Sequence, residues 1–206
     1  VIGKRAIGTH LDALSSFGAK FDIADSTITG KLATKPQSTQ NIFLDEASVT
    51  ATENALIFAA AKPYTTTIEN AACEPHVADL SNFLTSLGAK IEGIGSNRLV
   101  ITGSASLDSA DFTVGPDYID AGTFAIAAAA TGGDVTISPL RPDEMRMLTL
   151  YLSRFCVNSF WPSPDTLKIS ASNLSCDPEK LGIRQKFQTR PWPGFPTDLM
   201  SPLIVL

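Results

Sequence analysis

Several residue types and patterns are scarce or missing in this chain of 206 residues, and each absence excludes a class of protein. Its three cysteines, Cys73, Cys156 and Cys176, are odd in number and far apart, which fits thiols in a reducing cytoplasm better than a disulfide framework. No apolar run is long enough to cross a bilayer and no signal peptide is visible, so we expect no membrane association. The formal net charge of −5 argues against a nucleic-acid partner.

Motifs for bound metals and nucleotide cofactors are also missing. The sequence contains no zinc-ligand spacing, no Walker loop and no dinucleotide fingerprint. We interpret His10 as an ordinary exposed or half-packed histidine, and His76, in the first turn of a predicted helix, has no metal-ligand partner in the sequence. No metal site is therefore predicted.

The remaining composition is that of an ordinary globular protein, with 44% hydrophobic and 18% charged residues. A chain of this length forms one large or two small domains. It begins at Val1 rather than at methionine, and it stops at Leu206 within an apolar run that no cap or glycine closes. We therefore expect the chain to be a piece of a longer protein.

A helix followed by a hairpin recurs along the chain at an interval of about 70 residues. The first copy covers residues 9–29, with a helix that ends at Gly18 and a short hairpin after it. The second copy covers residues 75–101 and the third, more divergent copy covers residues 145–170. Such a repeat indicates that one structural unit is used several times.

Between these copies lie two alanine-rich helical stretches, each followed by a β-branched strand. Residues 52–61 lead to a strand at 64–68, and residues 123–130 lead to a strand at 134–137. Because both helices are apolar nearly all round, we expect them to be buried on every side, with the sheets outside them. Each repeat then consists of a strand, a helix, a second strand, a second helix and a hairpin, and this order predicts a mixed α/β fold.

The stretch Pro-Gly-Phe-Pro-Thr-Asp at 193–198 is the strongest candidate for chemistry. Its two prolines and its glycine restrict the backbone, and they place Asp198 at the predicted start of a helix. The same carboxylate would also suit an ordinary helix N-cap. The preceding loop at 172–193 is long and aperiodic, and loops of that length are usually functional or mobile.

Three segments together carry a family resemblance: residues 67–75, 116–124 and 193–198. With Leu-Gly-Ala-Lys at 87–90, they resemble the UDP-N-acetylglucosamine 1-carboxyvinyltransferases of the enolpyruvyl transferase family, over essentially the whole chain. The resemblance implies two domains, each an inside-out α/β barrel of repeated βαβαββ units. Residues 1–113 would be the later part of one domain, and residues 114–206 the earlier part of the other.

The resemblance also implies an activity. Such enzymes transfer the enolpyruvyl group from phosphoenolpyruvate to the 3-hydroxyl of UDP-N-acetylglucosamine and release phosphate, a step of peptidoglycan precursor synthesis that uses no metal or organic cofactor. The partners would be these two small molecules and the rest of the enzyme chain. We expect the fragment alone to be inactive.

Two alternatives remain. The shikimate-pathway enolpyruvyl transferase shares the fold, although Glu69-Asn70 and the motif at 195–198 favour the sugar-nucleotide enzyme. A divergent relative that binds without catalysis is favoured by departures from the family pattern. These departures are Ala6-Ile7-Gly8 in place of proline, an aliphatic residue and aspartate, Glu46 in place of lysine, Thr50 in place of glycine, and Gln188 and Trp192 in place of arginine and histidine.

Through the resemblance, Val-Ile-Gly-Lys-Arg at 1–5 matches the part of the family's catalytic loop that follows its general-acid cysteine. That acid would stand immediately before Val1, so none of the three cysteines takes its role. Arg5 would bind a phosphate or carboxylate of the substrates through its guanidinium group.

Two further sites follow from the resemblance. Ser48 and Val49 match a substrate-binding segment at the start of a buried helix, where free N–H groups would face the diphosphate. A plain N-cap role for Ser48 stays equally open. Asp198 would bind the substrate and act as the general base on the sugar 3-hydroxyl.

Overall fold

The computed structural model describes residues 6–25, 27–32, 39–171 and 187–206. The chain divides into two compact units, Val1–Val114 and Gly115–Leu206. Both units combine helices with β-sheets, so the predicted mixed α/β class is confirmed. None of the helices among the described residues has the length and apolar character needed to cross a bilayer.

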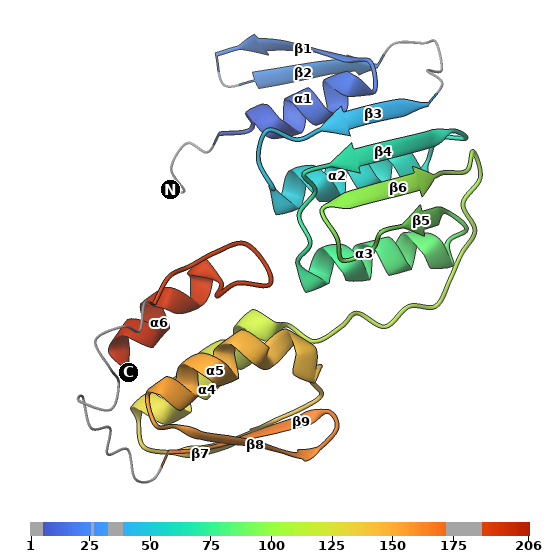
Figure 1. Ribbon diagram of the computed structural model, residues 1–206. Coiled ribbons are helices and arrows are strands. Elements are labelled where there is room, and N and C mark those ends of the chain that lie inside the picture. Colours follow the sequence, from blue (N-terminus) through green and yellow to red (C-terminus); the bar gives the residue numbers. More distant parts are fainter. Residues whose placement is uncertain (1–5, 26, 33–38, 172–186) are drawn as a thin grey trace. The chain divides into compact units, whose positions relative to one another are not determined.

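The first unit is built on a four-stranded sheet in the order β3-β4-β6-β5. Its strands are β3 (Gln40–Phe43), β4 (Thr65–Glu69), β5 (Lys90–Glu92) and β6 (Arg98–Thr102). β3 and β4 run parallel, and the other pairs are antiparallel. The crossover from β3 to β4 is α2 (Val49–Ala60), and α3 (Pro75–Ser86) leads from β4 to β5. Figure 1 shows both helices on the same face of this sheet.

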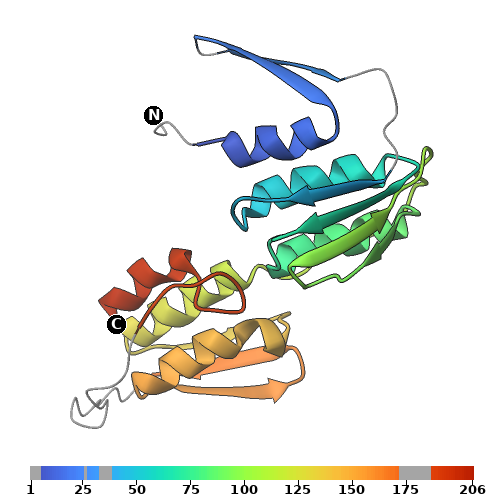
Figure 2. The same cartoon turned by 45° about the horizontal axis from the view of Figure 1, so that its top comes forward.

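A second helix and hairpin precede that sheet in the same unit. α1 (Gly8–Ser16) leads into the antiparallel strands β1 (Ala19–Ala24) and β2 (Thr27–Leu32). α1 lies beside α2 in both views (Figures 1 and 2). The contact includes the rings of Phe17 and Phe58, whose centroids are 4.4 Å apart. The core of the unit is therefore shared by α1, α2, α3 and the inner face of the sheet.

The second unit holds a three-stranded antiparallel sheet in the order β7-β9-β8. Its elements in chain order are α4 (Tyr118–Ala130), β7 (Asp134–Ile137), the 3-10 turn η1 (Pro142–Met145), α5 (Arg146–Arg154), β8 (Asn158–Ser163), β9 (Thr166–Ser170), the 3-10 turn η2 (Thr197–Leu199) and α6 (Met200–Val205). α4 and α5 cover one face of the sheet (Figure 1). This core also receives the buried side chains of Phe195, Leu199 and Leu203.

All three predicted helix–hairpin segments are present in the structure. They are α1 with β1 and β2, α3 with β5 and β6, and α5 with β8 and β9. In two of these segments, the strand before the helix pairs with the second strand of the hairpin, as β4 does with β6 and β7 with β9. β7 has the predicted bounds, because glycines and a threonine separate its β-branched residues from the helix before it.

The expectation that the alanine-rich helices are buried on every side is wrong for the described residues. Ile57 of α2 is 50% exposed and Phe124 of α4 is 61% exposed, and Ala127 and Ala130 are also exposed. Each helix packs one face against its own sheet, where Ala125 for example is fully buried. Within its own unit each helix therefore keeps some apolar side chains exposed, and an apolar composition cannot reveal which side chains are covered.

Two buried threonines lead to opposite predictions for stability. The Thr66 hydroxyl on β4 is fully buried and has no hydrogen-bond partner among the residues that the structure describes. The equally buried Thr52 hydroxyl donates to the Ser48 carbonyl (2.7 Å) and accepts from the Ala72 N–H (3.0 Å). An unpaired buried hydroxyl costs free energy, whereas removing a paired one leaves its partners unsatisfied.

We therefore expect Thr66→Val to raise the free energy of unfolding by about 1 kcal/mol, because valine keeps the shape and suits a strand. Thr52→Val should lower it by about 1–3 kcal/mol. Urea unfolding of both variants, followed by circular dichroism, measures the difference. Equal destabilisation by the two substitutions would contradict the assignment of Thr66 as unpaired.

Candidate functional site

The turn between β3 and α2 carries one set of predicted site residues, and the turn after β4 holds it in place. The Leu44 N–H donates to the Glu69 carbonyl at 3.1 Å. The Asn70 side-chain amide donates to the Leu44 carbonyl at 2.9 Å. Asn70 itself adopts φ of 58°, a left-handed conformation that asparagine tolerates better than most residues. The two turns therefore form one connected backbone structure.

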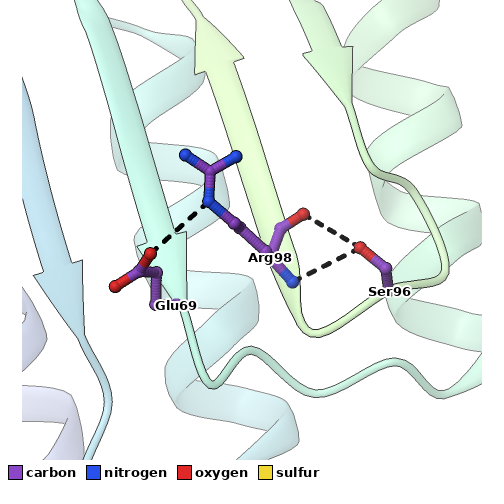
Figure 3. Close-up of polar contacts among 3 residues, drawn as sticks. All are labelled: Glu69, Ser96 and Arg98. Carbon is purple, nitrogen blue, oxygen red and sulfur yellow. Dashed lines mark hydrogen bonds and ion pairs between the residues drawn. The ribbon is translucent and has the colours of Figure 1, made fainter.

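Glu69 ends β4 beside these turns and takes part in a cross-strand ion pair (Figure 3). Its Oε1 lies 3.4 Å from Nε of Arg98, the residue directly opposite on β6. Ser96 fixes the start of that strand, because its Oγ donates to the Arg98 carbonyl (2.9 Å) and accepts from the Arg98 N–H (3.3 Å). Both charged side chains are more than half exposed, so the pair adds little stability. The Glu69 carboxylate thus stays accessible to solvent and ligands.

The N-terminus of α2 is capped by Ser48. The Ser48 backbone is extended, and its side-chain oxygen accepts from the Ala51 N–H at 3.4 Å, so the predicted N-cap role is confirmed. Val49 is the first residue of the helix. First-turn N–H groups have no partner within their helix and carry the positive end of its dipole. This turn can therefore accept an anionic group.

The first turn of α1 contacts the same region. The Thr9 hydroxyl donates to Asp45 Oδ1 at 2.7 Å, and Glu46 Oε1 lies 3.5 Å from the oxygen of the same Thr9 hydroxyl. Glu46, which departs from the family pattern, thus lies beside Thr9 in space. The predicted anion-binding residue Arg5 lies outside the described residues.

His10 joins α1 to α2 through both of its ring nitrogens. Nε2 lies 3.1 Å from the Thr50 hydroxyl, and Nδ1 lies 2.8 Å from the Asn54 side-chain nitrogen. A neutral ring that accepts at Nδ1 and donates at Nε2 satisfies both contacts. His10 is half-buried, as predicted, and its role here is to connect the two helices. Neither Asn54 nor this connection could be recognised from sequence spacing.

The motif at 193–198 forms a loop that one buried side chain anchors in the second unit. Phe195 is fully buried and stacks on Tyr151, with ring centroids 4.3 Å apart and planes at 10°. The Arg190 N–H donates to the Phe195 carbonyl at 3.0 Å, and the Gly194 N–H donates to the Pro191 carbonyl at 2.8 Å. A Cβ on Gly194 would lie 2.5 Å from Cβ of Arg190, so only glycine fits there. The loop therefore has a defined shape.

Asp198 is the middle residue of η2, directly after this loop, and its side chain is exposed. The alternative prediction that it caps a helix is wrong, because Pro196 is the N-cap of η2 and α6 begins after Leu199 without a side-chain cap. Among the described residues, none donates a hydrogen bond to its carboxylate. Buried Phe195 and Leu199 flank an acid that is itself free to meet a ligand.

Comparison with known proteins identifies the family. The family model described as EPSP synthase (3-phosphoshikimate 1-carboxyvinyltransferase) matches residues 1–202. The chain belongs to the EPSP synthase family. Curated relatives named UDP-N-acetylglucosamine 1-carboxyvinyltransferase include those of Borrelia garinii subsp. bavariensis and Borreliella burgdorferi, each 42% identical over 205 residues, and that of Bradyrhizobium diazoefficiens at 40%. These matches cover all of this chain and 48%, 48% and 47% of the respective relatives, so the chain spans about half their length.

Solved structures of enolpyruvyl transferases share the fold. The enolpyruvyl transferase NikO from Streptomyces tendae matches with a TM-score of 0.69 and 23% identity, over 80% of this chain and 42% of that one. An EPSP synthase from Acinetobacter baumannii matches with a TM-score of 0.56 and 19% identity, over 82% of this chain and 40% of that one. These structures show the fold, and the family model and the curated relatives confirm the predicted family.

The predicted site residues of this EPSP synthase family member fall in both units. Ser48 and Val49 are adjacent at the start of α2 in the first unit. Asp198 lies in the second unit, on the loop that Phe195 anchors. Trp192 of that loop, one of the departures from the family pattern, contacts Tyr118 edge to face, with ring centroids 5.4 Å apart. Its side chain therefore packs within the second unit.

The half-buried Cys73 is the cysteine whose environment is best defined. Burial, and then the charge of Glu74, raise the pKa of its thiol above the usual value. The thiolate is the nucleophilic form, so Cys73 has the opposite of an activated environment. This agrees with its interpretation as a structural or incidental cysteine.

We expect Cys73 to react with iodoacetamide more slowly at neutral pH than a cysteine in an unfolded peptide, and faster as the pH rises. Glu74→Gln should accelerate the reaction, because it removes the carboxylate that disfavours the thiolate. Mass spectrometry of alkylated Cys73 peptides measures both rates. A Cys73 that reacts as fast as the unfolded reference would contradict the raised pKa.

Proposed function

We propose that this chain is part of an enzyme that transfers the enolpyruvyl group from phosphoenolpyruvate to the 3-hydroxyl of UDP-N-acetylglucosamine. The observation that carries the proposal is the exposed Asp198 carboxylate on a loop fixed by Phe195, in a chain 42% identical to relatives named for this activity. The product would feed peptidoglycan synthesis. We place the enzyme in the cytoplasm, which cysteine usage supports.

Asp198 would act as the general base of the addition step. Its carboxylate takes the proton of the sugar 3-hydroxyl as that oxygen forms a bond to C2 of phosphoenolpyruvate. A general acid from the rest of the enzyme chain would give a proton to C3, which completes a tetrahedral adduct. Loss of a proton from C3 and of phosphate from C2 then regenerates the double bond. An exposed carboxylate without a protein hydrogen-bond donor among the described residues is suited to this role.

Ser48 and Val49 would bind the anionic diphosphate through the N-terminus of α2, and Arg5 would bind a phosphate or carboxylate. Asp198 would also hydrogen-bond the sugar. Glu46 opposes this binding, because its carboxylate lies beside the same turn, 3.5 Å from the Thr9 hydroxyl. We therefore expect weaker sugar-nucleotide binding than in an enzyme with lysine at this position.

The same proposal covers the architecture. We assign residues 1–113 to the later part of one inside-out α/β barrel and residues 114–206 to the earlier part of a second, both made of βαβαββ units. The shared strand order of β4-β6-β5 and β7-β9-β8 supports the repeat, and the unit boundary after Val114 supports the division. The rest of the enzyme chain would complete both barrels.

An assay of the full-length protein tests the function. Phosphate release from phosphoenolpyruvate is measured with UDP-N-acetylglucosamine or with shikimate 3-phosphate as acceptor, since the family description names the latter reaction. Phosphate release with UDP-N-acetylglucosamine as acceptor, and none with shikimate 3-phosphate, supports the proposal. Release with shikimate 3-phosphate supports the alternative transferase, and no release with either acceptor supports a non-catalytic relative. The 206-residue chain by itself should release none.

A further inference from the structure

In the second unit, α4 and η2 approach each other so closely at Gly122 that a side chain has no room there. A Cβ built on Gly122 would lie 2.4 Å from Cδ1 and 3.1 Å from Cδ2 of Leu199. Cβ atoms do not approach carbon at such distances without displacing it. The missing side chain therefore allows Leu199 to lie directly on the helix backbone.

Leu199 has little freedom to move away from Gly122. It is 1% exposed and belongs to the same buried cluster as Phe195 and Leu203. Its N–H donates to the Pro196 carbonyl at 3.3 Å, which closes the turn of η2. Because Leu199 directly follows Asp198, a shift of Leu199 is transmitted to the acid through the backbone of one short turn.

A second contact comes from the same face of the helix. Tyr118 lies four residues before Gly122, and residues at this spacing share a helix face. Its ring packs edge to face on Trp192, at the other end of the loop. The first two turns of α4 thus contact the loop on both sides of the motif that ends in Asp198.

We propose that Gly122 is a positioning residue, which sets the place of Asp198 by letting Leu199 pack against the backbone of α4. This inference rests on the proposed function, in which Asp198 is the general base. A base must lie within hydrogen-bond reach of the proton it takes. A misplacement of about 1 Å can reduce the rate by about 10²-fold.

The test uses the full-length enzyme with substitutions at both ends of the contact. Gly122→Ala adds one carbon atom and should lower kcat by roughly 10- to 100-fold with little change in KM for either substrate. Leu199→Val removes one carbon atom and should lower kcat as well, because it loosens the same contact. The double variant restores the total volume, so its kcat should return toward that of the unmodified enzyme. Gly133→Ala is the matched control, since a Cβ there meets no atom closer than 3.5 Å, and it should leave kcat unchanged.

The outcomes separate this inference from the proposed function. Loss of turnover in Gly122→Ala with recovery in the double variant supports positioning. If Gly122→Ala keeps the unmodified kcat, or if the double variant is no better than the worse single variant, positioning by Gly122 is overturned even when Asp198→Asn confirms the base. If Gly122→Ala does not fold, the comparison of Leu199→Val with the double variant decides, because only positioning predicts a higher kcat in the double variant.

Discussion

Asp198→Asn in the full-length enzyme is expected to lower kcat by roughly 10²- to 10⁴-fold, the usual contribution of a general base. Asparagine keeps the shape of the side chain but cannot take the proton of the sugar hydroxyl. The fold should not suffer, because the carboxylate is exposed and caps no helix in the structure. Steady-state phosphate release, with thermal unfolding as a check on folding, measures the effect.

The matched control is Asp134→Asn, another exposed aspartate of the same unit, at the first residue of β7. It should leave kcat unchanged, because the same chemical change there touches no proposed site. Unmodified turnover in Asp198→Asn would remove Asp198 from the mechanism. A drop confined to KM would instead limit its role to binding.

The second large effect is expected on stability. Phe195→Ala should lower the free energy of unfolding by about 3–5 kcal/mol, the typical cost of removing a buried phenylalanine ring. Phe195 is fully buried and stacks on Tyr151, so alanine would leave a cavity on the inner side of the loop. Since whole domains are stable by only about 5–15 kcal/mol, this is a large share. Urea unfolding measures it.

Phe160→Ala provides the control, because that ring is 48% exposed on β8 and its removal creates no cavity. Its cost should be well below that of Phe195→Ala. An equal cost at both positions would contradict the view that Phe195 anchors the loop. Phe195→Leu should fall between the two, because it keeps part of the buried volume.

Sequence reasoning predicted the helix–hairpin segments well, because helical spacing ending at Gly18 or Gly88 is a local signal. The class of fold followed from such segments, whereas the family followed from the resemblance carried by residues 67–75, 116–124 and 193–198. The candidate site was predicted as four separate residues, Arg5, Ser48, Val49 and Asp198, because motifs mark positions along the chain rather than contacts between them.

What could not be predicted depends on contacts between distant segments. Phe124 is exposed because it lies on a side of α4 that does not contact the sheet. Amino-acid composition does not indicate which side of a helix contacts a sheet. The contact of Gly122 with Leu199 and the hydrogen bond from Thr9 to Asp45 join residues far apart in the chain. A helical glycine gives no sequence signal that distinguishes close packing from a weak point in the helix.

The connected turns at the start of α2 have a consequence for binding. Asn70 holds the Leu44 carbonyl, and the Thr52 hydroxyl links the helix to the Ala72 N–H. The backbone that would meet a diphosphate has therefore lost its conformational entropy during folding, before any ligand arrives. A ligand that binds there does not have to order a flexible turn, and more of its contact energy remains as affinity.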